Sequence, residues 1–182
     1  VTLGDPGQRK ALYDRLFEQS ETYADDRAEQ HAWLGLVVTR LGVDWQAILD
    51  KRLFHLMNPE ELAETARRGF DLQLHTHRHR SPLEESLFVD ELRENRRVVE
   101  NSTGQAATHF CYPSGKTDPA FLPWLKAIGV ETGTTCVADL ARRDHDPLLL
   151  PRFTDTMGQS ELVFESWLSG AGAMLTRPRA VR

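Results

Sequence analysis

The chain has 182 residues, of which 40% are hydrophobic and 27% are charged, an ordinary composition for one folded domain with a small appendage. The 22 Lys and Arg residues against 27 Asp and Glu residues give a net charge of -5, the wrong sign for a protein held to nucleic acid by its phosphates. No stretch approaches the roughly 20 consecutive apolar residues of a membrane span. The first residues carry no export signal, so the sequence leaves the compartment open. The two cysteines, Cys111 and Cys136, lie far apart and do not have the spacing of a metal site. We expect them to be free thiols and not part of a disulfide framework.

Residues 1–56 are predicted to form helices. Apolar residues recur at helical spacing between Leu12 and Leu41, with acidic side chains between them. Asp44 can accept a hydrogen bond from the first turn of a further short helix. We interpret this helical segment as a lid, an insertion or an oligomer contact.

Residues 57–170 show a different pattern, in which helices alternate with short strands. Asn58 and Pro59 predict the start of a helix that should end at Gly69. Strands are predicted at 70–74, 109–112, 130–136 and 148–150, and further helices at 84–100, 118–129 and 160–168. Because helices between short apolar strands imply parallel pairing, the predicted class is α/β. Residues 171–182 are expected to be a loose basic tail.

The residues that follow the predicted strand 70–74 are the most informative part of the sequence: His75-Thr76-His77-Arg78-His79. In parallel α/β folds, ligands and catalytic groups collect at the carboxyl ends of the strands. Neutral imidazoles so close together favour a divalent cation such as Zn²⁺. The alternative is a basic surface turn that binds no metal.

This turn and the later segment Phe110-Cys111-Tyr112-Pro113-Ser114-Gly115 resemble two motifs of the polysaccharide deacetylases that share the NodB-homology domain. One motif is His-Ser/Thr-x-x-His after a strand, and the other is Arg-x-Pro-x-Gly, with Phe-x-Tyr-Pro-x-Gly variants. The resemblance runs from Met57 to Phe153, where Thr134-Thr135 and Leu150-Pro151-Arg152 are similar to bacterial members.

The resemblance implies a distorted or partial (β/α) barrel of parallel strands that hydrolyses N-acetyl or O-acetyl groups of a polysaccharide or glycan. It implies that His75 and His79 bind Zn²⁺ or another divalent metal such as Co²⁺, while His77 points elsewhere. The metal would polarise the acetyl carbonyl and lower the pKa of its water. The other implied positions are Ser114, whose backbone N–H would donate to the oxyanion, and Tyr112 and Pro113, which would contact the substrate. For Tyr112 the alternative is an ordinary core aromatic residue.

The sequence also departs from the family pattern. The family's Asp-Asp motif supplies the catalytic base and the third metal ligand, but we interpret Asp25-Asp26 as a solvated helix start, because helical stretches flank it. The resemblance therefore implies that this motif and the first strands lie upstream of Val1. Cys111 stands where the family has the arginine that orients the base. His145 lies in a polar loop and is not assigned as the general acid. Arg152 is a candidate for a charged partner in the site, but we favour the interpretation that it forms an ion pair at the surface.

Three hypotheses follow for the function. The first is a metal-dependent carbohydrate deacetylase whose activity is impaired because the Asp-Asp motif is absent. The second is a non-catalytic binding or assembly module that associates with itself or another chain through an exposed strand edge. The third is an amidohydrolase for a small amide, which the motifs do not separate from the first because a fold does not fix the substrate.

Overall fold

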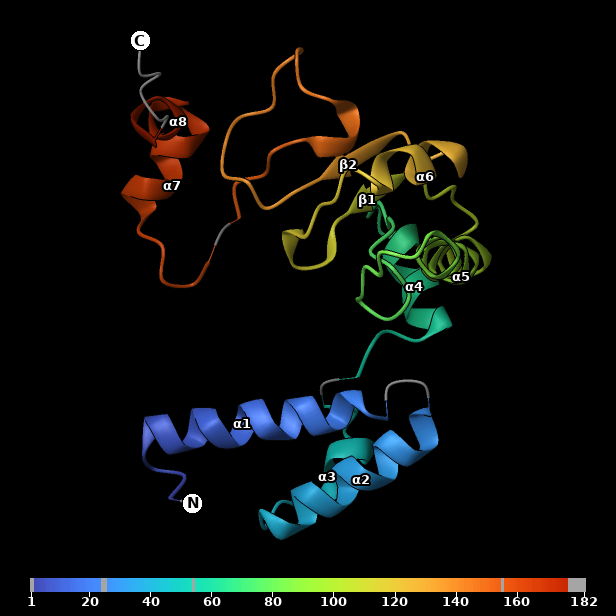
Figure 1. Ribbon diagram of the computed structural model, residues 1–182, viewed down its shortest axis with the longest axis vertical. Helices are drawn as coiled ribbons and strands as arrows, with labels where there is room; N and C mark the ends of the chain where they lie inside the picture. Colours follow the sequence, from blue (N-terminus) through green and yellow to red (C-terminus); the bar gives the residue numbers. More distant parts are fainter. Residues whose placement is uncertain (1, 24–25, 54, 155, 177–182) are drawn as a thin grey trace. The chain divides into compact units, whose positions relative to one another are not determined.

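The computed structural model describes residues 2–23, 26–53, 55–154 and 156–176 (Figure 1). The chain divides into two compact units, Val1–Leu56 and Met57–Arg182. Asp25 and residues 177–182, most of the expected basic tail, lie outside the described residues. No described helix combines the length and the apolar character that crossing a bilayer would need.

The first unit consists of three helices that each begin at an aspartate. They are α1 (Pro6–Glu21), α2 (Arg27–Arg40) and α3 (Trp45–Asp50). The Asp44 side chain accepts from the Ala47 N–H at the start of α3, as predicted. Asp26 is exposed and accepts from two backbone N–H groups of the first turn of α2 at 3.0 Å each. This confirms the interpretation of Asp26 as a solvated helix start.

Helix α4 (Pro59–Arg67) opens the second unit where the sequence predicted it. The Asn58 side chain accepts from the Glu61 N–H at 2.8 Å, and the Glu61 carboxylate accepts from the Asn58 N–H at 2.8 Å. This reciprocal arrangement satisfies two donors that the helix itself leaves unpaired. The chain leaves the helix at Gly69, whose φ of 90° suits a residue without a side chain.

Two short parallel strands, β1 (His109–Cys111) and β2 (Thr132–Thr134), form the sheet. Single parallel bridges extend it on both sides, from Leu74 to β1 and from Leu150 to β2. The predicted α/β class and parallel pairing are thereby confirmed, whereas the described residues form no closed barrel.

All four predicted strands are shorter than expected, and the segments 70–74 and 148–150 are each reduced to a single bridge. Of the segment 70–74, only Leu74 pairs with a neighbour. The segment predicted as 148–150 begins instead as a 3₁₀ turn, η2 (Pro147–Leu149), because the Asp146 side chain accepts from the Leu148 N–H. Only after this turn does Leu150 reach β2, so a local side-chain hydrogen bond competes here with strand formation.

Helices α5 (Glu85–Thr103) and α6 (Phe121–Ala127) lie beside the strands (Figure 1). Phe88 of α5 is fully buried, stacks on Phe121 of α6 with ring centroids 4.3 Å apart, and meets Phe110 of β1 edge to face at 6.2 Å. Such aromatic packing buries a large apolar area and fixes the ring geometry. The core therefore holds β1 firmly and sets the position of its carboxyl end.

The chain continues into α7 (Glu161–Leu168), which Ser160 caps, and α8 (Ala171–Thr176). Trp167 of α7 stacks on Phe153 with ring centroids 4.7 Å apart. The sequence predicted a loose tail from residue 171, and the structure instead places a short helix at its beginning.

Candidate functional site

The segments that carry the sequence motifs leave the sheet at one edge. Leu74, β1, β2 and Leu150 run parallel and in chain order, so residues 75–80, 112–117, 135–137 and 151–152 all follow carboxyl ends. This edge is where α/β proteins bind ligands. The sheet thus brings together motifs that are up to about 75 residues apart in the chain.

Two hydrogen bonds hold His75, one at its backbone and one at its ring. Its backbone N–H donates to the Asn95 Oδ1 at 2.8 Å, and its ring Nδ1 lies 2.7 Å from the Cys111 carbonyl oxygen. Because a carbonyl oxygen can only accept, Nδ1 carries the proton and donates. When the ring is neutral, its lone pair is therefore on Nε2, which is the arrangement that metal-binding histidines use.

His79 lies beside His75, with the two ring centroids 4.9 Å apart and the rings nearly edge to face. The turn between them is strained, because Thr76 and His79 have φ values of 61° and 55°. A positive φ is unusual for a β-branched residue such as Thr76. Thr76 is buried, and its Oγ1 accepts from the Arg80 N–H at 3.1 Å, which closes the turn. Such strain persists only where surrounding contacts enforce it, and it is common at functional sites.

A buried carboxylate on α5 supplies part of that enforcement. Glu91 is 2% exposed, and its Oε2 accepts from the Arg78 N–H at 2.7 Å. Its Oε1 accepts from Arg80 Nε at 2.7 Å and from Arg78 Nη1 at 3.1 Å. Burial alone raises the pKa of Glu91, but the hydrogen bonds from Arg80 and Arg78 outweigh it and leave the pKa below its usual value. Glu91 thus fastens the histidine turn to α5 as an ionised group.

His77 takes no part in the pairing of His75 with His79. Its Nε2 lies 3.9 Å from the Glu94 carboxylate on α5. Glu94 also accepts from Arg78 Nη1 at 2.6 Å. His77 thus lies among the charged groups that flank α5.

The turn Pro113–Gly115 follows β1 and forms a 3₁₀ turn, η1. Ser114 has a φ of 54°, and its amide donates to no acceptor among the described residues. Pro113 itself is buried. A side chain at Gly115 would come within 2.7 Å of the Cys136 Cβ, so only glycine fits this approach of the two segments.

Tyr112 lies in the core. Its ring is 1% exposed and packs edge to face on Phe110 with centroids 4.8 Å apart, and its hydroxyl donates to the Leu148 carbonyl at 2.9 Å. Burial, together with the charge of Asp146, raises the pKa of Tyr112 to about 12. This placement corresponds to the core alternative for Tyr112 and leaves its ring inaccessible to a sugar.

Arg152 follows the last of the four parallel segments. Its backbone N–H donates to the Val137 carbonyl at 2.9 Å, and its Nη2 lies 3.4 Å from the Cys136 Sγ. The surface ion pair expected from the sequence is not formed with any described residue. The hydrogen bond to Cys136 raises the pKa of Arg152, against the effect of burial, and the neighbouring Cys111 raises it further.

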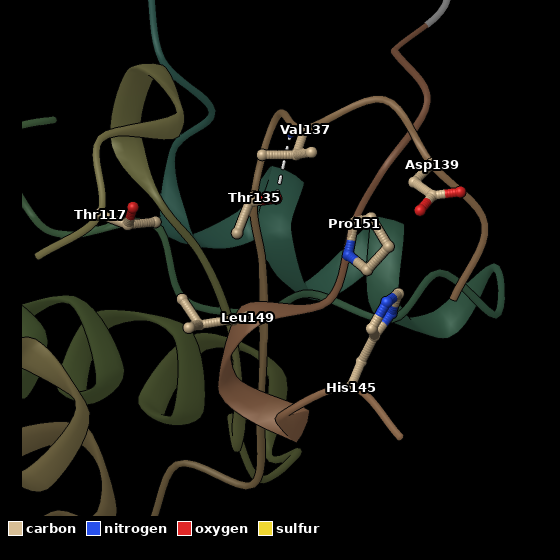
Figure 2. Close-up of a pocket in the computed structure, with 7 residues that line it drawn as sticks. All are labelled: Thr117, Thr135, Val137, Asp139, His145, Leu149 and Pro151. Carbon is tan, nitrogen blue, oxygen red and sulfur yellow. Dashed lines mark hydrogen bonds between the residues drawn. The ribbon is translucent and has the colours of Figure 1, made fainter. Parts of the chain in front are cut away.

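A pocket of about 240 Å³ opens beside these segments (Figure 2). Its lining combines Thr117, Thr135, Val137, Asp139, His145, Leu149 and Pro151. The volume is below the roughly 300–1,000 Å³ of pockets for drug-sized ligands, so the pocket can hold only a small ligand or part of a larger one. The sequence placed His145 in a solvated loop, whereas the structure makes it part of this wall. No local motif indicates the pocket, because its lining comes from several separate segments.

The arrangement offers a metal two imidazole nitrogens. His75 and His79 fit a divalent cation in donor chemistry, and His75 also in tautomer. Within residues 2–23, 26–53, 55–154 and 156–176, no group of three or more His, Cys, Asp or Glu side chains could hold a metal ion. The described residues therefore show no complete metal site, and His75 and His79 could supply two of the ligands that one would need.

Comparison with known sequences matches residues 27–133 to the family described as polysaccharide deacetylase. The match begins in α2, earlier than the resemblance seen in the motifs, and includes both the histidine turn and the Pro113–Gly115 turn. It ends within β2, before Arg152. No curated protein matches the chain.

Among solved structures, the chain is similar to Streptococcus pyogenes deacetylase PplD in complex with acetate, with a TM-score of 0.58 and 18% identity over 68% of this chain and 54% of that one. It is also similar to IcaB from Ammonifex degensii, with a TM-score of 0.53 and 22% identity over 65% and 54%. A polysaccharide deacetylase from Bacillus cereus gives a TM-score of 0.54 and 18% identity over 64% and 38%. These likenesses show a deacetylase-like fold, and the chain spans about half of the length of these proteins or less.

Proposed function

The chain belongs to the polysaccharide deacetylase family, and from this premise we propose that it carries the histidine part of a metal-dependent site that removes acetyl groups from a glycan. One observation carries the proposal. The Cys111 carbonyl holds His75 in the tautomer that leaves Nε2 free, with the His79 ring 4.9 Å away. Zn²⁺ or Co²⁺ bound there would polarise the acetyl carbonyl and lower the pKa of its water toward neutrality.

In this proposal the protein residues bind and orient the substrate around the histidines. The free amide of Ser114 donates to the oxygen of the acetyl group as negative charge develops on it. The neighbouring glycine, Gly115, lets this turn lie against the next segment without a side chain between them. The finer fold assignment, a partial (β/α) barrel, belongs to the same proposal, because the four parallel segments have the order that such a barrel requires.

The pocket of Figure 2 is proposed to hold the sugar ring that carries the acetyl group. Its apolar wall of Val137, Leu149 and Pro151 can cover the face of a ring, and Thr117, Asp139 and His145 offer polar groups. Small pockets with a few polar groups in an apolar wall are typical of small-molecule sites.

Titration of the chain with Zn²⁺ tests the proposal. Wild-type protein should bind weakly, because two imidazoles make an incomplete site, and His75→Ala or His79→Ala should abolish the binding. His77→Ala is the matched control from the same turn and should bind as wild type does, because His77 faces Glu94. Equal losses in all three variants, or full binding by His75→Ala, would contradict the assignment. Absence of binding by the wild type would favour the non-catalytic module.

The substrate class requires a separate assay. Release of acetate from acetylated glycan fragments is compared with hydrolysis of small amides, each with added Zn²⁺ or Co²⁺. Low but metal-dependent release from the glycan alone is expected. Turnover of small amides only would replace the glycan deacetylase by an amidohydrolase.

A further inference from the structure

The arginine at position 152 has an unusual environment for a charged side chain. Arg152 Nη2 lies 3.4 Å from the Cys136 thiol, and the nearby Cys111 adds to the rise in the pKa of the guanidinium. A neutral thiol is a weak hydrogen-bond acceptor. The Arg152 Nε is buried and has no acceptor among the described residues. The guanidinium is thus held in place while part of its donor fork is left unused.

Three other arginines in this unit have close carboxylate partners. Arg78 and Arg80 bind Glu91, and Arg142 binds Asp139 at 2.9 Å. Arg152 has no carboxylate partner among the described residues, and because its Nε is buried, the Nη groups are the donors that an anion could reach.

The position of Arg152 relates it to the histidines. It follows Leu150, at the same carboxyl edge of the sheet as His75. Both residues lie near Cys111: the ring Nδ1 of His75 is 2.7 Å from the Cys111 carbonyl oxygen, and Cys111 helps to raise the pKa of Arg152. Cys111 is also the position at which the motif Arg-x-Pro-x-Gly would have its arginine, so the guanidinium of Arg152, from another segment, lies near the position that lacks one.

We infer that Arg152 is an anion-binding residue of the site and that it binds the carboxylate of acetate, the product of the proposed hydrolysis. The inference rests on the proposed function for the identity of the anion, but its chemistry needs no metal. Carboxylate binding by Arg152 would hold the leaving product at the sheet edge, close to the pocket wall formed by Pro151 and Val137.

The neighbouring thiol makes the inference testable on the protein as it is. Cys136 is exposed and free, so its alkylation by iodoacetate and by iodoacetamide can be followed by peptide mass spectrometry, with EDTA present. The two reagents have nearly the same size and differ in that iodoacetate carries a carboxylate. The ratio of their rates cancels the intrinsic reactivity of the thiol and reports how strongly the surroundings attract a carboxylate.

We expect Arg152→Gln to lower the ratio of iodoacetate to iodoacetamide rates by about threefold or more at low ionic strength, the size expected of a partly exposed ion pair. Arg152→Lys keeps the charge without the fork and should give an intermediate ratio. Arg93→Gln is the control, because it changes the net charge equally on the exposed surface of α5. Acetate should slow the iodoacetate reaction of the wild type more than the iodoacetamide reaction.

An unchanged ratio in Arg152→Gln, or an equal drop in Arg93→Gln, would overturn the inference, as would failure of acetate to slow the iodoacetate reaction selectively. Circular dichroism of each variant checks that it is folded. If Arg152→Gln does not fold, the comparison of Arg152→Lys with the wild type still tests the inference. The Zn²⁺ titration and the alkylation fail independently, because one depends on His75 and His79 and the other on Arg152 with the metal removed.

Discussion

Replacement of Glu91 by glutamine tests whether a buried carboxylate holds the histidine turn. Glu91 accepts through both oxygens, from the Arg78 N–H on one and from Arg80 Nε and Arg78 Nη1 on the other. Glutamine has the same shape but one accepting oxygen, so its NH₂ group must face at least one of these donors. The substitution also removes the only charge that is nine-tenths buried among the described residues.

The expected loss of stability follows from these contacts. A hydrogen bond to a charged group contributes about 1.5–3 kcal/mol. The Arg78 and Arg80 side chains are 39% and 43% exposed, so they can regain water when their partner is lost. We therefore expect Glu91→Gln to lower the free energy of unfolding by about 2 kcal/mol at pH 7, below the 3–5 kcal/mol typical of breaking a fully buried ion pair.

The stabilisation that Glu91 provides should depend on pH. The pKa of Glu91 is lower in the folded protein than its usual value. The stabilisation is therefore present above the unfolded pKa of about 4.3 and is lost as the pH falls through the folded pKa. The difference in unfolding free energy between wild type and Glu91→Gln should be largest near pH 7 and should shrink toward pH 3.

The assay is urea denaturation of both proteins across this pH range, with amide exchange of residues 75–80 to locate the change. Glu94→Gln is the matched control, because Glu94 binds the same Arg78 from the surface of α5 with its side chain 41% exposed. Its loss should be clearly smaller. If Glu91→Gln unfolds like Glu94→Gln, or if its deficit does not depend on pH, the carboxylate is not what fastens the turn.

Substitutions at three further positions test the surroundings of the site, each by urea denaturation. Tyr112→Phe removes the 2.9 Å hydrogen bond to the Leu148 carbonyl and should cost about 1 kcal/mol; no loss would show that water replaces the hydroxyl. Gly133→Ala would place a Cβ 2.5 Å from the same carbonyl oxygen and should cost about 1–3 kcal/mol, unless the segments separate freely. Asn95→Ala removes the acceptor of the His75 N–H and should cost about 1 kcal/mol and weaken Zn²⁺ binding, whereas Asn95→Asp keeps an oxygen there and should lose less. Equal effects of the two Asn95 variants would refute the role of this hydrogen bond.

Local sequence signals determined the helix boundaries and the motif positions. Asn58 with Glu61, Asp44 and Gly69 act on backbone groups within a few residues, so their effect does not depend on the rest of the fold. The order of the histidine turn and the Pro113–Gly115 turn likewise indicated the polysaccharide deacetylase family from residue types and spacing alone, and the family match confirms it.

Tertiary structure decided which side chains meet. The tautomer of His75 depends on a carbonyl 36 residues away, and the environment of Arg152 depends on Cys136 of a different segment. Tyr112 follows a motif-bearing strand, yet the alternation of the strand turns its ring into the core. The segment 148–150 has an apolar sequence typical of a strand, yet Asp146 makes it turn first.

The sequence by itself therefore determined that the chain has a parallel α/β pattern with two histidines at a strand end, because these features arise from short-range periodicity and from residue chemistry. Only the sheet decided how four distant segments come together, because no single segment encodes its pairing with another. These segments follow Leu74, Cys111, Thr134 and Leu150. The same sheet set Arg152 beside Cys136 of the neighbouring parallel segment.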